Sequence, residues 1–317
     1  MDFQLSDDQR ALRAGVRDLL AGRFDRDRMR AALENGTAVD PALWRELGDA
    51  GFFALRLPEA EGGVGLGLPE AVLLFEEAGR VLLPGPLVAT HLAAGAVKGA
   101  ARGEAVVAVA EAGQPVAHLG GADALLVLGP GDLPGGLVRD AGPVREAAAP
   151  LRSTDPFTPL WRPARPVTAD EPLPLPPGAR HLRDEGALLT AAEQLGSAAR
   201  TTELAVEYAG TREQFGAPIG SFQAVKHLCA GMLVRAELAR CAVYAAAVTG
   251  DRVEIAGAKL LADDAAVRNA RDCLQVHGGM GFTWESDVHL HLKRAWLRAG
   301  WWQTAAAAEE RLAADLR

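Results

Sequence analysis

Three residues that follow a helix-period segment have side chains suited to binding a phosphate group beside a planar ring. Arg212 offers a forked cationic donor, Gln214 an amide and Phe215 an aromatic ring, all within four residues. Gly216 and Pro218 break the preceding helix, so the three side chains are presented at its C-terminal edge. This trio suits a pyrophosphate next to a planar ring. The same residues also fit a structural role, in which Arg212 complements the helix dipole and Phe215 is a hydrophobic plug.

The elements that must position these residues are three helices between residues 187 and 281. Apolar and small residues recur at steps of three and four on both sides of the turn, which predicts two amphipathic helices. The second stripe is long for a globular helix and favours a bundle. A third helix is expected from about Val253 to Val276, with Asp251 as N-cap and Gly278-Gly279 at its end. The two stripes are Leu188, Ala192, Leu195, Ala199, Thr202 and Val206, and Phe222, Val225, Cys229, Met232, Ala236, Ala239, Val243 and Ala246.

Two motifs in this region resemble the C-terminal domain of the acyl-CoA dehydrogenase family. The first runs from Tyr208 to Val225 and contains Arg-Glu-Gln-Phe-Gly; the second, Gln-Val-His-Gly-Gly-Met-Gly-Phe, occupies residues 275–282. The glycine-rich run 51–65 is similar to part of the family's N-terminal helical domain. The resemblance implies a mostly α fold, with an N-terminal helical domain at 1–100, a reduced middle β domain with a proline-rich connection at 101–178, and a C-terminal four-helix-bundle-like domain at 179–317.

The resemblance also implies FAD as the cofactor, held across a subunit interface. Gly278 and Gly279 have a physical reason to be glycine there, because a backbone without Cβ lets a phosphate or an adenosine lie against it. The positions carried over from the family as contacts to FAD are Arg212, Gln214, Phe215, Gln223, Gln275, Gly278 and Gly279.

Composition excludes several other classes of protein. A net charge of −8 without a Lys/Arg block argues against nucleic-acid binding. Cys229, Cys241 and Cys273 lie in helix-period segments, so we expect reduced core thiols of a cytoplasmic protein, and their spacing fits no metal site. No apolar run approaches the roughly 20 residues that a membrane span needs, and the acidic N-terminus is no signal peptide.

The chain before residue 187 changes character near residue 100. Ser6 is expected to cap a first helix that runs to about Phe24, and further helices are expected up to Lys98. Short alanine- and valine-rich runs at 105–110 and 124–128 then predict strands. The stretch 166–177 contains too many prolines for a helix or a central strand, so we expect a stiff connection.

The catalytic base is where this chain departs from the family pattern. The reaction requires a carboxylate that removes the proton α to the thioester carbonyl. Many family members have a glutamate downstream of the Gly-Gly motif, where this chain has Trp301 and Trp302. Another branch places it at the position of Gly186 here, one residue from Glu185. Glu193 lies two turns further along the same face, where apolar neighbours would raise its pKa, although it also fits an interhelical partner of an arginine. The base is therefore left unassigned, with Glu185 and Glu193 as candidates.

Two other features of the C-terminal region have simple interpretations. His289 and His291 are two residues apart, so they diverge on a helix and we expect ordinary surface or interface histidines. A last helix is expected from about Ala299 to Leu316, with Trp301 and Trp302 at its start.

The resemblance implies FAD-dependent α,β-dehydrogenation of an acyl-CoA thioester, by this chain as an enzyme or as the shorter subunit of a heteromeric enzyme. It further implies a homo- or hetero-oligomer, dimer or tetramer, and an electron-transfer flavoprotein as acceptor. Two alternatives stay open. One is a flavin-dependent oxidase or monooxygenase on the same scaffold, and the other is a non-catalytic structural partner of a full-length acyl-CoA dehydrogenase.

Overall fold

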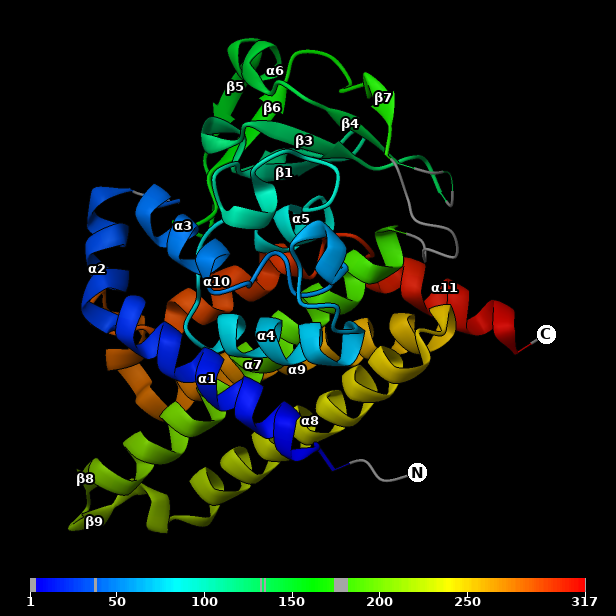
Figure 1. Cartoon of the computed structure of the whole chain (residues 1–317). Coiled ribbons are helices and arrows are strands. Elements are labelled where there is room, and N and C mark those ends of the chain that lie inside the picture. The colour runs from blue at the N-terminus through cyan, green and yellow to red at the C-terminus, as the bar shows by residue number, and fades with distance from the viewer. Residues whose placement is uncertain (1–3, 37–38, 132, 134, 174–181, 317) are drawn as a thin grey trace. The chain divides into compact units, whose positions relative to one another are not determined.

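The computed structural model describes residues 4–36, 39–131, 133, 135–173 and 182–316. The chain is mostly helical, with short strands in its middle section (Figure 1). The α-helices are α1 Asp7–Arg23, α2 Arg26–Asn35, α3 Pro41–Asp49, α4 Leu68–Arg80, α5 Leu87–Leu92, α6 Gly142–Glu146, α7 Leu182–Thr211, α8 Gln223–Thr249, α9 Arg252–His277, α10 Val288–Arg298 and α11 Ala305–Asp315. The 3-10 helices are η1 Glu59–Glu61, η2 Ala100–Arg102, η3 Leu119–Gly121, η4 Ile219–Ser221 and η5 Gly278–Phe282.

Contacts between residues divide the chain into two compact units. The helical unit comprises Met1–Leu20, Val72–Leu83 and Ala187–Arg317, and the mixed unit comprises Ala21–Ala71 and Pro84–Gly186. The N-terminal helices are thus shared between the two units. The division into three domains at residues 100 and 178 remains a prediction.

Local capping explains where several of the expected helices begin and end. At the start of α1, the Ser6 hydroxyl accepts from the Gln9 backbone N–H, and the Gln9 side chain accepts from Ser6 N–H, a reciprocal capping box. Asp251 caps α9 by accepting from the backbone N–H groups of Val253 and Glu254. These two sequence predictions are confirmed.

The helical unit is built on α7, α8 and α9, and α8 and α9 pack along one another (Figure 1). The expected inner stripe of α8 is buried at Met232, Ala236, Ala239, Val243 and Ala246. The expectation of three core thiols is wrong for Cys241, which is exposed because it lies on the opposite face of α8 from this stripe.

The helices α4 and α7 cross within the helical unit at two glycines. A Cβ on Gly196 would lie 1.9 Å from the carbonyl oxygen of Glu76, and a Cβ on Gly79 would lie 2.0 Å from that of Glu193. Only glycine permits backbones to approach this closely. The side chain of Glu76 then accepts a hydrogen bond from Tyr244 at 2.6 Å and is ion-paired with Arg240, so the crossing is tied to α8.

The mixed unit contains two small sheets. One has the order β1-β3-β4-β7, with β1 and β3 parallel and the other pairs antiparallel; the other is antiparallel with the order β2-β6-β5. Their core is apolar and includes Val116, Leu119 and Leu125. The strands are β1 Val107–Ala110, β2 Val116–Ala117, β3 Ala124–Val127, β4 Gly136–Val138, β5 Ala148–Leu151, β6 Leu160–Pro163 and β7 Glu171–Pro172. The two expected strands are therefore present, while part of the expected proline-rich connection, residues 174–177, lies outside the described residues.

No helix in the described part of the chain combines the length and the apolar character needed to cross a membrane.

Candidate functional site

The turn between α7 and α8 is a short β-hairpin that presents the predicted arginine, amide and aromatic ring. Arg212 directly follows α7, and β8 (Glu213–Gln214) pairs with β9 (Ala217–Pro218). The two loop residues Phe215 and Gly216 have φ values of 54° and 79°, which is typical of the tight turns that close two-residue hairpins. A phenylalanine at positive φ is uncommon, and its side chain is 95% exposed. Phe215 is thus held in an unfavourable backbone conformation with its ring in solvent.

The second motif ends α9. Gly278 adopts φ 60° and ψ −142°, a conformation that side-chain-bearing residues rarely adopt. A Cβ on Gly278 or on Gly279 would meet no other atom within 4 Å, whereas a Cβ on Gly281 would lie 3.0 Å from the Cβ of His277. Gly281 is therefore explained by packing within the chain. Gly278 and Gly279 instead leave an open stretch of backbone.

A stacked pair of rings brings the two motifs together. Tyr208, one turn before Arg212, lies against His277, which directly precedes Gly278; the ring centroids are 4.1 Å apart and the planes differ by 19°. The His277 ring also lies with Nδ1 2.9 Å from the carbonyl oxygen of Cys273. The hairpin and the end of α9 therefore lie at the same end of the helical unit, and we call this region the open end.

All seven residues predicted to contact the cofactor are exposed at or beside the open end. Arg212 anchors the hairpin through its backbone, since its carbonyl accepts from Ile219 N–H at 2.8 Å. Among the described residues, its guanidinium forms no ion pair. A free cationic fork, an exposed ring and an open glycine backbone fit the pyrophosphate and a planar ring of a dinucleotide. These groups form one wall only, so a second surface is needed to enclose a ligand.

The first candidate base, Glu193, is buried in the helical unit. Its carboxylate is 2.6 Å from Nη2 of Arg298, and both side chains are nearly inaccessible. Burial raises the pKa of the Glu193 carboxyl, while Arg298 and Arg294 oppose that rise. Glu193 is thus the interhelical partner of an arginine, and no substrate proton can reach it in this arrangement.

Glu193 belongs to a larger group of buried polar side chains, which we call the buried cluster: Glu193, Gln194, Lys259, Asp263 and Arg298. Lys259 and Asp263 form an ion pair one turn apart on α9, and Nζ of Lys259 also donates to the Arg298 carbonyl at 3.1 Å. The Gln194 amide donates to Asp263 at 3.0 Å. Sequence analysis missed Lys259 and Asp263, although charged residues four apart in an alanine-rich segment signal such a pair.

The second candidate base, Glu185, lies in the mixed unit. Its two carboxylate oxygens are 2.8 and 3.2 Å from the two terminal nitrogens of Arg56, a bidentate ion pair. Its side chain is only 12% exposed. Both candidate carboxylates are therefore occupied by arginines.

The C-terminal region differs from the expectation in two respects. The helix expected from Ala299 begins only at Ala305, because residues 300–303 form a turn in which Trp302 has φ 64° and is buried. His289 and His291 are buried rather than on the surface, because α10 turns both of them inward. Nδ1 of His291 is 2.8 Å from the Ser197 hydroxyl, and burial lowers the pKa of His291 to about 3.

Comparison with known proteins agrees with this arrangement. The family model described as "Acyl-CoA dehydrogenase, N-terminal domain" matches residues 6–103, and that of the C-terminal domain matches residues 181–301. The chain is 38% identical over 300 residues to acyl-CoA dehydrogenase IpdE2 of Mycobacterium tuberculosis, covering 91% of each protein.

Two solved structures share the fold over nearly their whole length. One is the ChsE4-ChsE5 complex from Mycobacterium tuberculosis, with 26% identity, a TM-score of 0.84 and coverage of 100% of this chain and 99% of that one. The other is a variant of the Tcur3481-Tcur3483 steroid acyl-CoA dehydrogenase, with 27% identity, a TM-score of 0.81 and coverage of 98% of both chains. The chain belongs to the acyl-CoA dehydrogenase family.

Proposed function

We propose that this chain is the shorter subunit of a heteromeric, FAD-dependent acyl-CoA dehydrogenase, and that a second, full-length chain completes its active site. The observation that carries the proposal is a contrast within the chain: the cofactor-binding side chains are exposed at the open end, whereas both candidate bases are paired with arginines. Two similar structures are complexes of unlike chains by their titles, which supports a heteromer.

At the open end, the residues of this chain would bind and orient FAD. Arg212 would hold the pyrophosphate as a fixed cationic fork, and Phe215 would lie against a planar ring. The backbone at Gly278 and Gly279 would approach the cofactor without a clashing Cβ. Bound FAD supplies the hydride acceptor for the β carbon of the acyl group, and the electrons would then pass to an electron-transfer flavoprotein.

The proton α to the thioester carbonyl would be removed by a base of the partner chain. Glu185 and Glu193 would each have to break an arginine ion pair to act, and Glu193 would also have to reach solvent. The substrate class that best fits is an acyl-CoA with a bulky, steroid-like acyl group, since a 27% identical structure is described as a steroid acyl-CoA dehydrogenase.

Arg212→Ala tests this assignment. The chain is co-expressed with its partner, and flavin absorbance and helix content are compared with those of Arg268→Ala, an exposed arginine on α9. Loss of a charge-assisted hydrogen bond should weaken FAD binding by about 10- to 100-fold, or about 1.4–2.8 kcal/mol, without loss of helix. Arg268→Ala should retain its flavin.

Full flavin in Arg212→Ala would show that this arginine does not hold the cofactor. A complex that never binds flavin would contradict the proposed function as a whole. The chain without its partner is expected to show no acyl-CoA dehydrogenation.

A further inference from the structure

The helix α8 has a second apolar stripe, on the face opposite the buried one. Leu233, Val234, Leu238 and Val248 are each more than half exposed. At about 1.5 Å per residue, the stripe is about 27 Å long. Its positions are three and four residues apart: Ala230, Val234, Leu238, Cys241, Ala245 and Val248. An exposed apolar stripe of this length indicates an interface.

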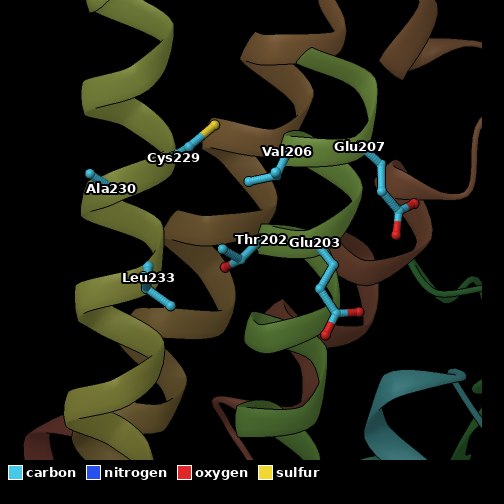
Figure 2. Close-up of a pocket in the computed structure, with 7 residues that line it drawn as sticks. All are labelled: Thr202, Glu203, Val206, Glu207, Cys229, Ala230 and Leu233. Carbon is cyan, nitrogen blue, oxygen red and sulfur yellow. The ribbon is translucent and has the colours of Figure 1, made fainter. Parts of the chain in front are cut away.

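A groove lies beside this stripe, between α7 and α8. It has a volume of about 420 Å³ and is lined by Thr202, Val206, Cys229 and Leu233 among others. Figure 2 shows Thr202 and Val206 of α7 and Leu233 of α8 reaching toward each other, while the carboxylates of Glu203 and Glu207 turn away. Sequence analysis placed Val206 on the core-facing stripe of its helix, but it is 53% exposed at this groove.

The charges beside the stripe are symmetric about one point of the helix. Glu237 directly precedes Leu238 and Arg240 directly follows Ala239. Lys226 lies twelve residues before Leu238, and Asp251 lies twelve residues after Ala239. Residues eleven apart return to nearly the same side of an α-helix, so Lys226 and Glu237 share one edge of α8. Each cation therefore has an anion at the same distance on the other side of the midpoint.

This symmetry is what a two-fold contact of a helix with its own copy requires. In such a contact residue i meets residue j, and residue j meets residue i. An antiparallel pair centred between Leu238 and Ala239 would place Glu237 near the second copy's Arg240, and Lys226 near its Asp251. It would also bring Val248 of the second copy opposite Cys229, at the wall of the groove.

We infer that two copies of this chain associate through an antiparallel contact between their α8 helices, which we call the α8 contact. An unlike partner would place no constraint on the charges of this chain, whereas two charge pairs here share a single midpoint. The contact is independent of the proposed cofactor site at the open end. It joins two shorter subunits in whatever assembly they form.

Leu238→Glu tests the α8 contact, because it puts two carboxylates side by side at the two-fold axis. Two differently tagged copies of the full chain are co-expressed together with the partner chain, and recovery of one tag with the other is measured. Leu261→Glu is the matched control, since Leu261 is a half-exposed leucine on the outer face of α9. We expect Leu238→Glu to lower co-recovery at least tenfold and Leu261→Glu to leave it unchanged.

A gain-of-contact experiment covers the case in which Leu238→Glu fails to fold. Leu238→Cys in a Cys241→Ser background should give a disulfide-linked dimer of this chain under mild oxidation, and Leu261→Cys should not. Failure of the wild-type tags to co-purify, or equal co-recovery with Leu238→Glu, would overturn the inference. Release of an unlike chain by Leu238→Glu, with the tags still paired, would overturn it too. Flavin content measured on the same samples separates these outcomes from failure of the proposed function.

Discussion

The open end and the buried cluster both contain charged side chains, but they place them in opposite environments. At the open end Arg212 is exposed next to open backbone, whereas Glu193 and Arg298 in the buried cluster are almost inaccessible and ion-paired. An exposed cation without a partner in its own chain is available to a ligand. A buried carboxylate paired with an arginine is committed to the fold. The difference indicates that residue type alone does not identify a catalytic group.

The largest effect is expected from breaking the buried cluster. Glu193→Ala leaves the Arg298 guanidinium buried without its partner, which should cost about 3–5 kcal/mol of unfolding free energy. Denaturant unfolding of the full chain measures this cost. Glu207→Ala is the control, because Glu207 pairs with Arg200 at the surface and should change stability by less than about 1 kcal/mol.

The same substitutions at the candidate bases can break the comparison. Loss of a general base typically lowers the rate by about 10²–10⁴-fold. If Glu193→Gln or Glu185→Gln reduced turnover of the assembled enzyme by that factor while the complex kept its flavin, that carboxylate would be catalytic. We expect stability to fall and turnover of the remaining folded enzyme to persist.

The next effect concerns pH and a histidine close to the buried cluster. Burial lowers the pKa of His291 to about 3, with further contributions from Arg200, Arg294, Arg298 and Arg80. Its unfolded-state pKa is about 6.5, so the unfolded chain binds the proton more readily below that pH. Stability is therefore fully present above pH 6.5 and falls as the pH drops toward 3. Between pH 6.5 and 5 the loss should be about 2 kcal/mol.

Unfolding curves of wild type and His291→Asn across this pH range measure that contribution. The variant should lose stability less steeply with acid. His91→Asn is the matched variant in the mixed unit, where burial lowers the pKa of His91 to about 4. Identical pH slopes in wild type and His291→Asn would contradict the assignment of His291 as a neutral buried group.

The smallest effect is expected at the open end and sharpens the comparison from the other side. Gly279→Ala meets no atom of the chain within 4 Å, so unfolding should change little. A ligand lying against this backbone would be displaced, and FAD binding should weaken by about 1 kcal/mol, or roughly fivefold. Titration of the apo complex with FAD measures this change. Unaltered FAD affinity would place the cofactor away from Gly279.

Much of the fold could be predicted because helix periodicity and caps are local signals. The helices α7, α8 and α9 follow from residues three and four apart, and Asp251 marks the start of α9 where it was expected. The turn at Trp302 could not be predicted, because an alanine-rich segment around it carries no helix breaker other than Gly300. There, packing of the buried indole decides the backbone conformation.

The site could be predicted in part for the same reason. The hairpin and the glycine pair are compact motifs, so their residues are visible in sequence. Their proximity depends on the stacking of Tyr208 and His277, which is a contact between distant helices. The arginine partners of Glu185 and Glu193 are also distant in sequence, and no spacing rule connects Glu193 to Arg298 or Glu185 to Arg56.

The contact between Gly196 and Glu76 gives an inaccessible position leverage over the surface of the protein. One methyl group at residue 196 would push α4 aside and carry the Glu76 carboxylate away from Arg240 and Tyr244. Arg240 lies beside the midpoint of the outer face of α8. The hydrogen atom that glycine has in place of a side chain thus sets the alignment of a surface on which a whole subunit would dock.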